Sequence, residues 1–346
     1  MELVHQKLNK YSYLILFFLF MSICFGHGYA VLNRYDPSNI AWLDDVVFYL
    51  NIVEHGLGSI EFDHAGRSTR VLVPYISHLI YQILPKLGSW NMSLFSMLLL
   101  SSFFTSMNSI LIFHLCQKVY KNYVIGIIAS FLFISNFVVS NFYLIGLIDS
   151  GYALAFTTLI YLMYMNKWEW IPFVSILGCL TKETFLPIGS VLMVAWLFFE
   201  YFRKKEFEFR KFSLIFISIL LSLASLMVLN YYFVDQIFSP LGHISGLKRT
   251  YFLPINFTEI FMTILRFSMA IGFIFVLAIL NIRNLPHSIL FPTLCAILTT
   301  VLLGWWVGIG GAGYARGIFS VASFVITAGA ASFIYLIIKP ADNDKI

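Results

Sequence analysis

The polar segment 33–70 holds a dense group of side chains capable of acid–base and phosphate chemistry. Its carboxylates include Asp44 and Asp45, and its cations include Arg67 and Arg70. A carboxylate can take a proton from an acceptor hydroxyl, and the planar fork of arginine suits a phosphate. Acids and arginines crowded into one loop are typical of an active site, and a pure anchor would not need them.

The residues around the two acids predict how they are positioned. The stretch 42–56 predicts a short helix that begins at Asp44 and Asp45, where carboxylates can cap the helix and suit its dipole. Asp45 and Tyr49 are four residues apart and therefore share one face. Either acid is a candidate catalytic base, and helix capping alone is the alternative for both.

Arg67 and Arg70 are three residues apart and lie on one face if this segment is helical. They precede the apolar stretch 71–87, which also contains prolines and polar residues. Recognition of a phosphate is one interpretation of the two arginines, and contact with lipid headgroups is the other.

Charged residues also separate later apolar runs. Asp149 lies in the motif GLIDSG, where it either caps the following helix or belongs to a site. Lys182 and Glu183 lie in the motif TKET, where they either pair locally at a turn or bind substrate. Ionisable residues between apolar segments of a membrane protein are functional candidates by default.

Four more cations are candidates for phosphate binding. Arg266 lies in an otherwise apolar helix, so it must face the bundle interior or snorkel outward. Arg316 follows the glycine-rich stretch 308–313, which would let the backbone approach a ligand closely. Lys248 and Arg249 lie in a second polar segment.

Composition indicates the class of protein that must position these residues. The chain is 60% hydrophobic and 11% charged, with a mean hydropathy of +0.84, whereas soluble domains average roughly 25% charged. A helix needs about 20 apolar residues to cross a bilayer. We therefore expect an all-α polytopic membrane protein, with residues 1–346 forming one transmembrane domain of about ten spans: 11–32, 91–117, 122–141, 147–166, 169–183, 184–202, 212–233, 257–280, 286–307 and 315–338.

Basic residues predict the orientation of these spans. With the N-terminus inside, the other loops expected in the cytoplasm carry Lys118, Lys121, Lys167, the basic run 203–211, Arg283 and Lys339. The C-terminus is then cytoplasmic as well. Only one crossing fits between segment 33–70 and Lys118, so 71–87 should be a helix in the outer interface. Segments 33–90 and 234–256 would be the two large outer loops.

Cofactors and nucleic acids are not indicated by the sequence. The formal net charge of +5 is explained by cytoplasmic Lys and Arg, and not by a nucleic-acid partner. Neither a metal-ligand spacing nor a nucleotide-binding motif occurs. No cofactor is therefore predicted, although a divalent metal ion would be compatible with the acids.

The order of the motifs resembles that of a known family. An acidic D-x-x-x-Y-L segment at 45–50 is followed by R-x-x-R-V-L-x-P at 67–74, by the acid that opens a later span and by TKET. Together they resemble the GT-C superfamily of polyprenyl-phosphate-sugar-dependent glycosyltransferases. They are most similar to small bacterial members related to the dolichyl-phosphate-mannose-protein mannosyltransferase and aminoarabinose transferase group. The resemblance covers roughly residues 10–200.

The resemblance implies an enzyme of the bacterial cell envelope, in the cytoplasmic (inner) membrane. It would transfer a sugar, with inversion, from a polyprenyl-phosphate donor to a glycan, lipid or protein acceptor at the outer face. Asp45 would be the first-loop acid, with Asp44 as its rival, and Asp149 the second-loop acid. Lys182 would lie near the lipid phosphate, and Arg316 is similar to a late arginine of the family.

Two other functions remain open on the sequence. An envelope polysaccharide polymerase or ligase also uses outer-loop arginines. A lipid-linked sugar flippase or other transporter would place polar residues near the membrane midplane, often within inverted repeats. Charged residues concentrated on one side of clean apolar runs favour the glycosyltransferase.

Overall fold

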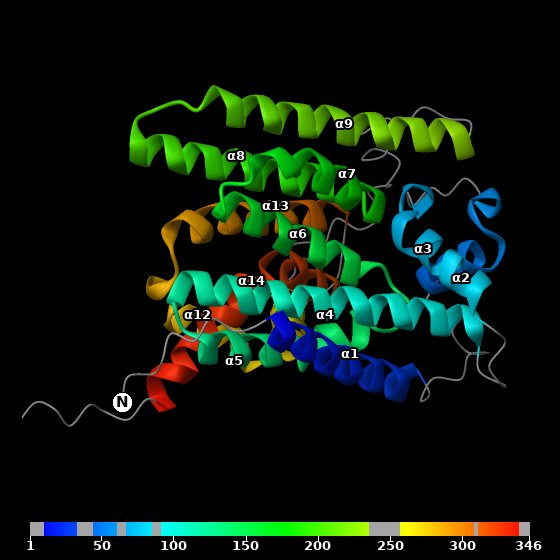
Figure 1. Ribbon diagram of the computed structural model, residues 1–346, viewed down its shortest axis with the longest axis horizontal. Coiled ribbons are helices and arrows are strands. Elements are labelled where there is room, and N and C mark those ends of the chain that lie inside the picture. Colours follow the sequence, from blue (N-terminus) through cyan, green and yellow to red (C-terminus); the bar gives the residue numbers. More distant parts are fainter. Residues whose placement is uncertain are drawn as a thin grey trace, which may run out of the picture.

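The computed structural model describes residues 10–32, 44–60, 67–84, 91–234, 257–307 and 311–338, and all regular structure in these ranges is helical. The chain is a multi-pass, all-helical membrane protein. Among the described residues, six helices are long and apolar enough to cross a membrane. These are α1 (Lys10–Leu32), α4 (Met92–Tyr120), α8 (Phe185–Lys204), α9 (Phe209–Val234), α13 (His287–Val307) and α14 (Gly311–Ile338), shown in Figure 1.

The other predicted spans are shorter or broken, so the expectation of about ten full spans is not met. Three of the apolar runs form α5 (Tyr123–Ile134), α6 (Asp149–Tyr164) and α7 (Ile171–Thr181), each too short for a single-helix span by length. The run 257–280 forms α11 (Phe257–Ile271) and α12 (Phe273–Leu280), which meet at 89° and count as a seventh span at most.

Identifiable residues cause these breaks. Gly272 has φ +72°, a left-handed conformation that glycine adopts without strain, and it ends α11. The side chain of Asn136 donates a hydrogen bond of 2.9 Å to the carbonyl of Ile271 at that break. Asn136 also accepts a hydrogen bond from the backbone of Val138, just beyond the end of α5. One asparagine therefore satisfies polar backbone groups at two helix interruptions inside the bundle.

The first polar loop contains the two short helices that the sequence predicts. They are α2 (Asp44–His55) and α3 (Leu72–Ile83), with single 3₁₀ turns at Leu57–Ser59 and Arg67–Thr69. Twelve residues span about 18 Å, which is less than the ~30 Å of a hydrocarbon core. Both helices lie together at one end of the bundle, at the right of Figure 1, where Ile52, Ile60 and Val71 pack on the last turns of α9.

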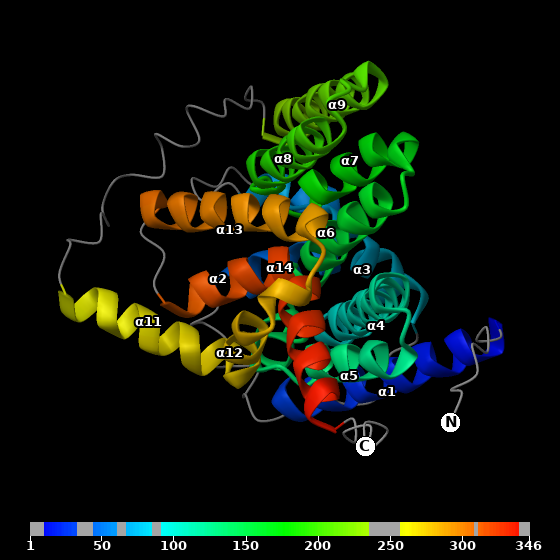
Figure 2. The same ribbon diagram turned by 90° about the vertical axis from the view of Figure 1, so that its left-hand side faces the viewer.

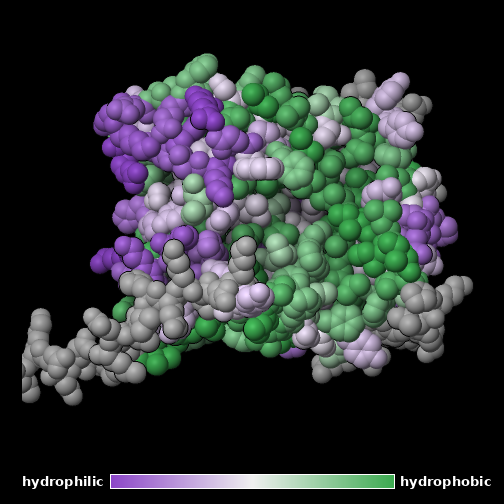
Figure 3. Space-filling view, in the orientation of Figure 1, coloured by the Kyte–Doolittle hydropathy of each residue, from purple (hydrophilic) through white to green (hydrophobic). Residues whose placement is uncertain are grey.

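Residues predicted to be cytoplasmic lie at the opposite end of the bundle. The junction of α8 and α9 carries Arg203, Lys204 and Lys205, and Arg210 at the start of α9 pairs with Glu169 at 2.7 Å. This junction lies at the left of Figure 1, and Figure 3 shows a strongly hydrophilic patch there. The basic loops and the α2–α3 region are thus separated by the length of the bundle.

Helix α14 lies at the centre of the bundle. Nearly every residue from Ala315 to Ser332 is buried, and α14 packs against α5, α6, α11, α12 and α13. Figure 2 shows it enclosed by these helices. Its alanine, serine and glycine side chains let neighbouring backbones approach closely, as is usual where helices associate in lipid. Arg316, near its first turn, is therefore placed inside the protein.

Cysteine labelling tests the predicted sidedness. Ile83 at the end of α3 is 81% exposed, and Lys205 and Arg283 are exposed at the basic end. In oriented vesicles a membrane-impermeant maleimide should label Ile83→Cys from one side only, and Lys205→Cys and Arg283→Cys from the other. Labelling of Ile83→Cys and Lys205→Cys from the same side would contradict the predicted topology.

Candidate functional site

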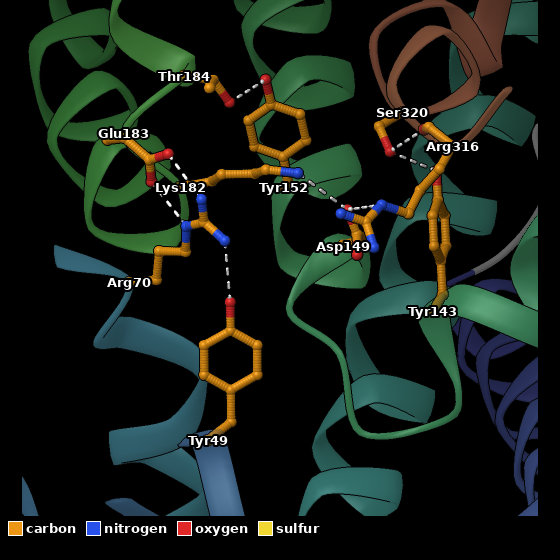
Figure 4. Close-up of polar contacts among 10 residues, drawn as sticks. All are labelled: Tyr49, Arg70, Tyr143, Asp149, Tyr152, Lys182, Glu183, Thr184, Arg316 and Ser320. Atoms are coloured by element: carbon orange, nitrogen blue, oxygen red, sulfur yellow. Dashed lines mark hydrogen bonds and ion pairs between the residues drawn. The ribbon is translucent and has the colours of Figure 1, made fainter. Parts of the chain in front are cut away.

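A buried carboxylate held by two cations forms the centre of the candidate site. Asp149 Oδ1 lies 3.4 Å from Lys182 Nζ and 3.4 Å from Arg316 Nε, as Figure 4 shows. The Asp149 side chain is only 2% exposed. A carboxylate removed from water is costly unless it is paired, so the two cations make its burial possible. The three residues come from the start of α6, the α7–α8 turn and α14.

A tight turn between α7 and α8 places Lys182. Helix α7 ends because Lys182 adopts an extended backbone, with φ −159° and ψ 124°. Gly178 allows the turn to close, because a Cβ there would lie 2.7 Å from the ring of Phe185. Lys182 Nζ lies 5.2 Å from the centroid of the Tyr152 ring, within cation–π range. The hydroxyls of Tyr152 and Thr184 are hydrogen-bonded at 3.1 Å.

A second ion pair connects this turn to the first loop. Arg70 donates two hydrogen bonds of 2.8 Å to the two carboxylate oxygens of Glu183, and a third of 3.3 Å to the Tyr49 hydroxyl. Burial opposes the charge of Arg70, but the Glu183 carboxylate and the Tyr49 hydroxyl together outweigh it and hold the Arg70 pKa well above its ordinary value. Burial also raises the pKa of Tyr49 to about 12, so the phenol stays protonated. This pair fixes α2 and the start of α3 against the turn.

A third pair is more open to solvent. Arg67 Nη1 lies 3.3 Å from Asp45 Oδ1, and its guanidinium carbon is 5.3 Å from the centroid of the Phe48 ring. The side chain of Asp45 is 36% exposed, against 2% for Asp149. Among the described carboxylates of the site, Asp45 is therefore the most accessible to an external molecule, whereas Asp149 is enclosed by its own cations.

The network is enclosed by the protein, since the side chains of Arg70, Lys182, Glu183 and Asp149 are at most 13% exposed. The apolar stretch Trp168–Thr181, which begins at the basic end, rises only about 21 Å, less than the ~30 Å of a hydrocarbon core. Helix α9 has 26 residues and continues past this level to reach Ile52 and Val71. Because α6 and α7 are shorter than α9, the TKET turn and Asp149 lie within the bundle and not at its end.

The distances distinguish the pairs in strength. Charge-assisted hydrogen bonds usually measure about 2.7–2.9 Å, as those between Arg70 and Glu183 do. The contacts of Lys182 and Arg316 with their shared Asp149 are longer, at 3.4 Å each. Among the described residues, Arg70, Lys182 and Arg316 face two carboxylates, Asp149 and Glu183, so the described part of the network carries one excess positive charge. Its electrostatics therefore suit an additional anion.

The structure brings together most, but not all, of the predicted site residues. Asp149, Lys182, Glu183, Arg70 and Arg316 form one network, with Asp45 and Arg67 beside it. Arg266 is exposed on α11, so the expectation that it binds substrate with the others has no support in the described contacts. The side chain of Asp44, and the whole of Lys248 and Arg249, lie outside the described residues.

Sequence reasoning missed the uncharged partners of the network. Tyr152 follows Asp149 by three positions on α6, and Ser320 follows Arg316 by four on α14, so helical spacing could have found both. The Ser320 hydroxyl donates to the carbonyl of Arg316 at 2.8 Å and is 2.9 Å from the hydroxyl of Tyr143. No group of three potential metal ligands is found among the described residues.

Comparisons with known proteins do not assign the chain to a family. No family matches it, and neither a curated protein nor a solved structure is similar to it. The resemblance to the GT-C superfamily therefore rests on the motifs alone.

Removing the Glu183 charge should test the role of the Arg70 pair. Glu183→Gln leaves the Arg70 charge buried and unpaired, so the variant should lose about 3–5 kcal/mol of stability. Melting of the purified protein in detergent would measure the loss. Glu169→Gln, which breaks a well-exposed pair with Arg210, is the control and should change the melting temperature far less. The double variant Arg70→Met, Glu183→Met should recover most of the loss; equal melting of Glu183→Gln and wild type would refute the structural role.

Proposed function

We propose that this protein is a membrane glycosyltransferase of the GT-C type that uses a polyprenyl-phosphate-linked sugar as donor. One observation supports this most: an enclosed network with excess positive charge lies beside an accessible carboxylate. The network suits the phosphate that leaves with the polyprenyl chain, and the carboxylate suits the acceptor hydroxyl that attacks. The acceptor would be a glycan, lipid or protein at the outer face of the bacterial cytoplasmic membrane.

The contact distances indicate different roles for the three cations. Lys182 and Arg316 share one carboxylate at 3.4 Å, so each can contact an incoming phosphate while it stays beside Asp149, and we assign them to donor binding. Arg70 is already satisfied by Glu183 and Tyr49. We therefore assign Arg70 a positioning role, in place of the direct phosphate contact that the sequence suggested.

Asp45 is assigned as the general base, and Asp149 as a positioning residue. In the proposed step Asp45 accepts the hydroxyl proton of the acceptor, and the acceptor oxygen forms a bond to the anomeric carbon. The bond between that carbon and the phosphate oxygen breaks on the opposite face, which inverts the configuration. The polyprenyl phosphate leaves with the electron pair, and Lys182 and Arg316 stabilise its charge. Arg67, paired with Asp45, keeps the base oriented.

A transporter of lipid-linked sugars is the second candidate, favoured by the depth of the network. Transporters place substrate sites inside the bundle, near the bilayer midplane, and the Asp149 network lies within the bundle, about 21 Å from its basic end, which is beyond the midpoint of a ~30 Å core. Both candidates bind an anionic polyprenyl phosphate in the same network. They differ in whether the accessible Asp45 takes part in a chemical step.

Substitution of Asp45 should separate the two candidates. Asp45→Asn keeps the size of the side chain but cannot take a proton at neutral pH, so sugar transfer should fall about 10²–10⁴-fold. Transfer would be measured in proteoliposomes with undecaprenyl-phosphate donors that carry labelled sugars. Glu54→Gln is the matched control, because Glu54 lies on the same helix but pairs with Ser93 of α4. Translocation of the donor without transfer in wild type, unchanged in Asp45→Asn, would establish the transporter instead.

Substitution of Lys182 tests the phosphate site independently of chemistry. Lys182→Ala removes a cation that contacts phosphate before and during the reaction, so it should weaken both donor binding and turnover. Undecaprenyl phosphate without a sugar is the binding probe. Asp45→Asn should bind this probe as wild type does. Equal binding of the probe by Lys182→Ala and wild type would remove Lys182 from the donor site.

A further inference from the structure

A second polar site lies at the basic end of the bundle, far from the Asp149 network. It is a cavity of about 280 Å³, a size near the lower end of small-ligand sites. Four separate parts of the chain build it: the end of α6, the end of α8, the start of α9 and the start of α13. Its lining residues are Met163, Tyr164, Asn166, Trp196, Glu200, Arg203, Lys204, Glu208, Lys211 and Ser288.

Ion pairs between lysines and glutamates form one wall of this cavity. Lys211 is only 5% exposed and contacts both Glu200 and Glu208. Lys204 also pairs with Glu208, at 2.8 Å. Hydrogen bonds from Lys204 and Lys211 lower the pKa of the Glu208 carboxyl, so it stays ionised. Both carboxylates of the cavity are thereby occupied by lysines.

The remaining polar side chains that line the cavity can all donate hydrogen bonds. Arg203 has no carboxylate partner within the described part of the chain, and the side chains of Tyr164, Asn166 and Ser288 likewise make no hydrogen bond there. The cavity lining has three cations against two carboxylates, which leaves an excess charge of +1. A guanidinium that shares a cavity with neutral hydrogen-bond donors is suited to recognise a phosphate.

We propose that this cavity binds an anionic phosphate group, and that the headgroup of an anionic phospholipid supplies it. Exposed aromatic side chains surround the α8–α9 junction, with Phe202 63% and Phe207 56% exposed. Aromatic side chains are enriched at membrane interfaces, where cations attract anionic headgroups. The phosphate would connect α6, α8, α9 and α13, so its binding should stabilise the folded bundle. The site is separate from the proposed glycosyltransferase activity.

Lipid-dependent melting tests this proposal. Wild type would be melted in nanodiscs of phosphatidylcholine and in nanodiscs that also contain phosphatidylglycerol. Phosphatidylglycerol should raise the melting temperature of wild type and have little effect on Arg203→Gln. Arg283→Gln is the matched control, because Arg283 is an exposed arginine at the same end that does not line the cavity. It should respond to the lipid as wild type does. In a titration, Arg203→Gln should bind the lipid about tenfold more weakly.

A second arm identifies the source of the phosphate. Inorganic phosphate would be added to protein in phosphatidylcholine alone, with chloride at equal ionic strength as the reference. Stabilisation by inorganic phosphate that Arg203→Gln abolishes would keep the phosphate site but assign it to a soluble ligand. If phosphatidylglycerol and inorganic phosphate changed the melting temperatures of wild type, Arg203→Gln and Arg283→Gln equally, the proposal would be overturned. If Arg203→Gln and Arg283→Gln lost the same part of the stabilisation by phosphatidylglycerol, the proposal would also be overturned. Such a result would show only a general attraction between positive charge and the anionic lipid.

Discussion

The buried charge of Asp149 is the constraint on which the arrangement of the bundle depends. A carboxylate that is 2% exposed must be compensated, and its partners Lys182 and Arg316 come from distant parts of the sequence. Their contacts therefore hold the start of α6, the α7–α8 turn and α14 together. Helix α6 begins and helix α7 ends at this level, and Arg316 lies near the first turn of the central helix α14.

The TKET turn connects the Asp149 network to the helices of the first loop. Lys182 has an extended backbone, so consecutive side chains point in different directions. Lys182 reaches Asp149, whereas its neighbour Glu183 reaches Arg70, and Arg70 also holds Tyr49 of α2. The helix that carries Asp45 is thus fixed relative to the cations proposed to bind phosphate, through two adjacent residues. An enzyme needs such fixed separation between a base and a leaving-group site.

Sequence patterns predicted the membrane class and the helices of the first loop, because hydropathy and charge placement are local properties. They did not predict the depth of the network. The apolar run 169–183 has nearly the composition of a span, and only its packed structure shows that α7 stops at Thr181. Composition likewise could not show the break at Gly272, nor that Arg266 faces outward. Tyr152 was missed because a tyrosine in an apolar helix is indistinguishable from a core residue until its ring is seen beneath Lys182.

Pairing geometry also determines which cations remain available to a ligand. Arg70 is hydrogen-bonded to the Glu183 carboxylate at 2.8 Å and to the Tyr49 hydroxyl. Breaking these hydrogen bonds would cost more free energy than a contact with a new anion would provide. Lys182 and Arg316 share one oxygen at 3.4 Å. A second anion between them would relieve their mutual repulsion without breaking a short bond. The same argument holds at the basic end of the bundle. Lys204 and Lys211 are paired with glutamates, whereas Arg203 lines the cavity without a described carboxylate partner. The availability of a cation in this protein therefore follows from its carboxylate contacts, and burial alone does not predict it.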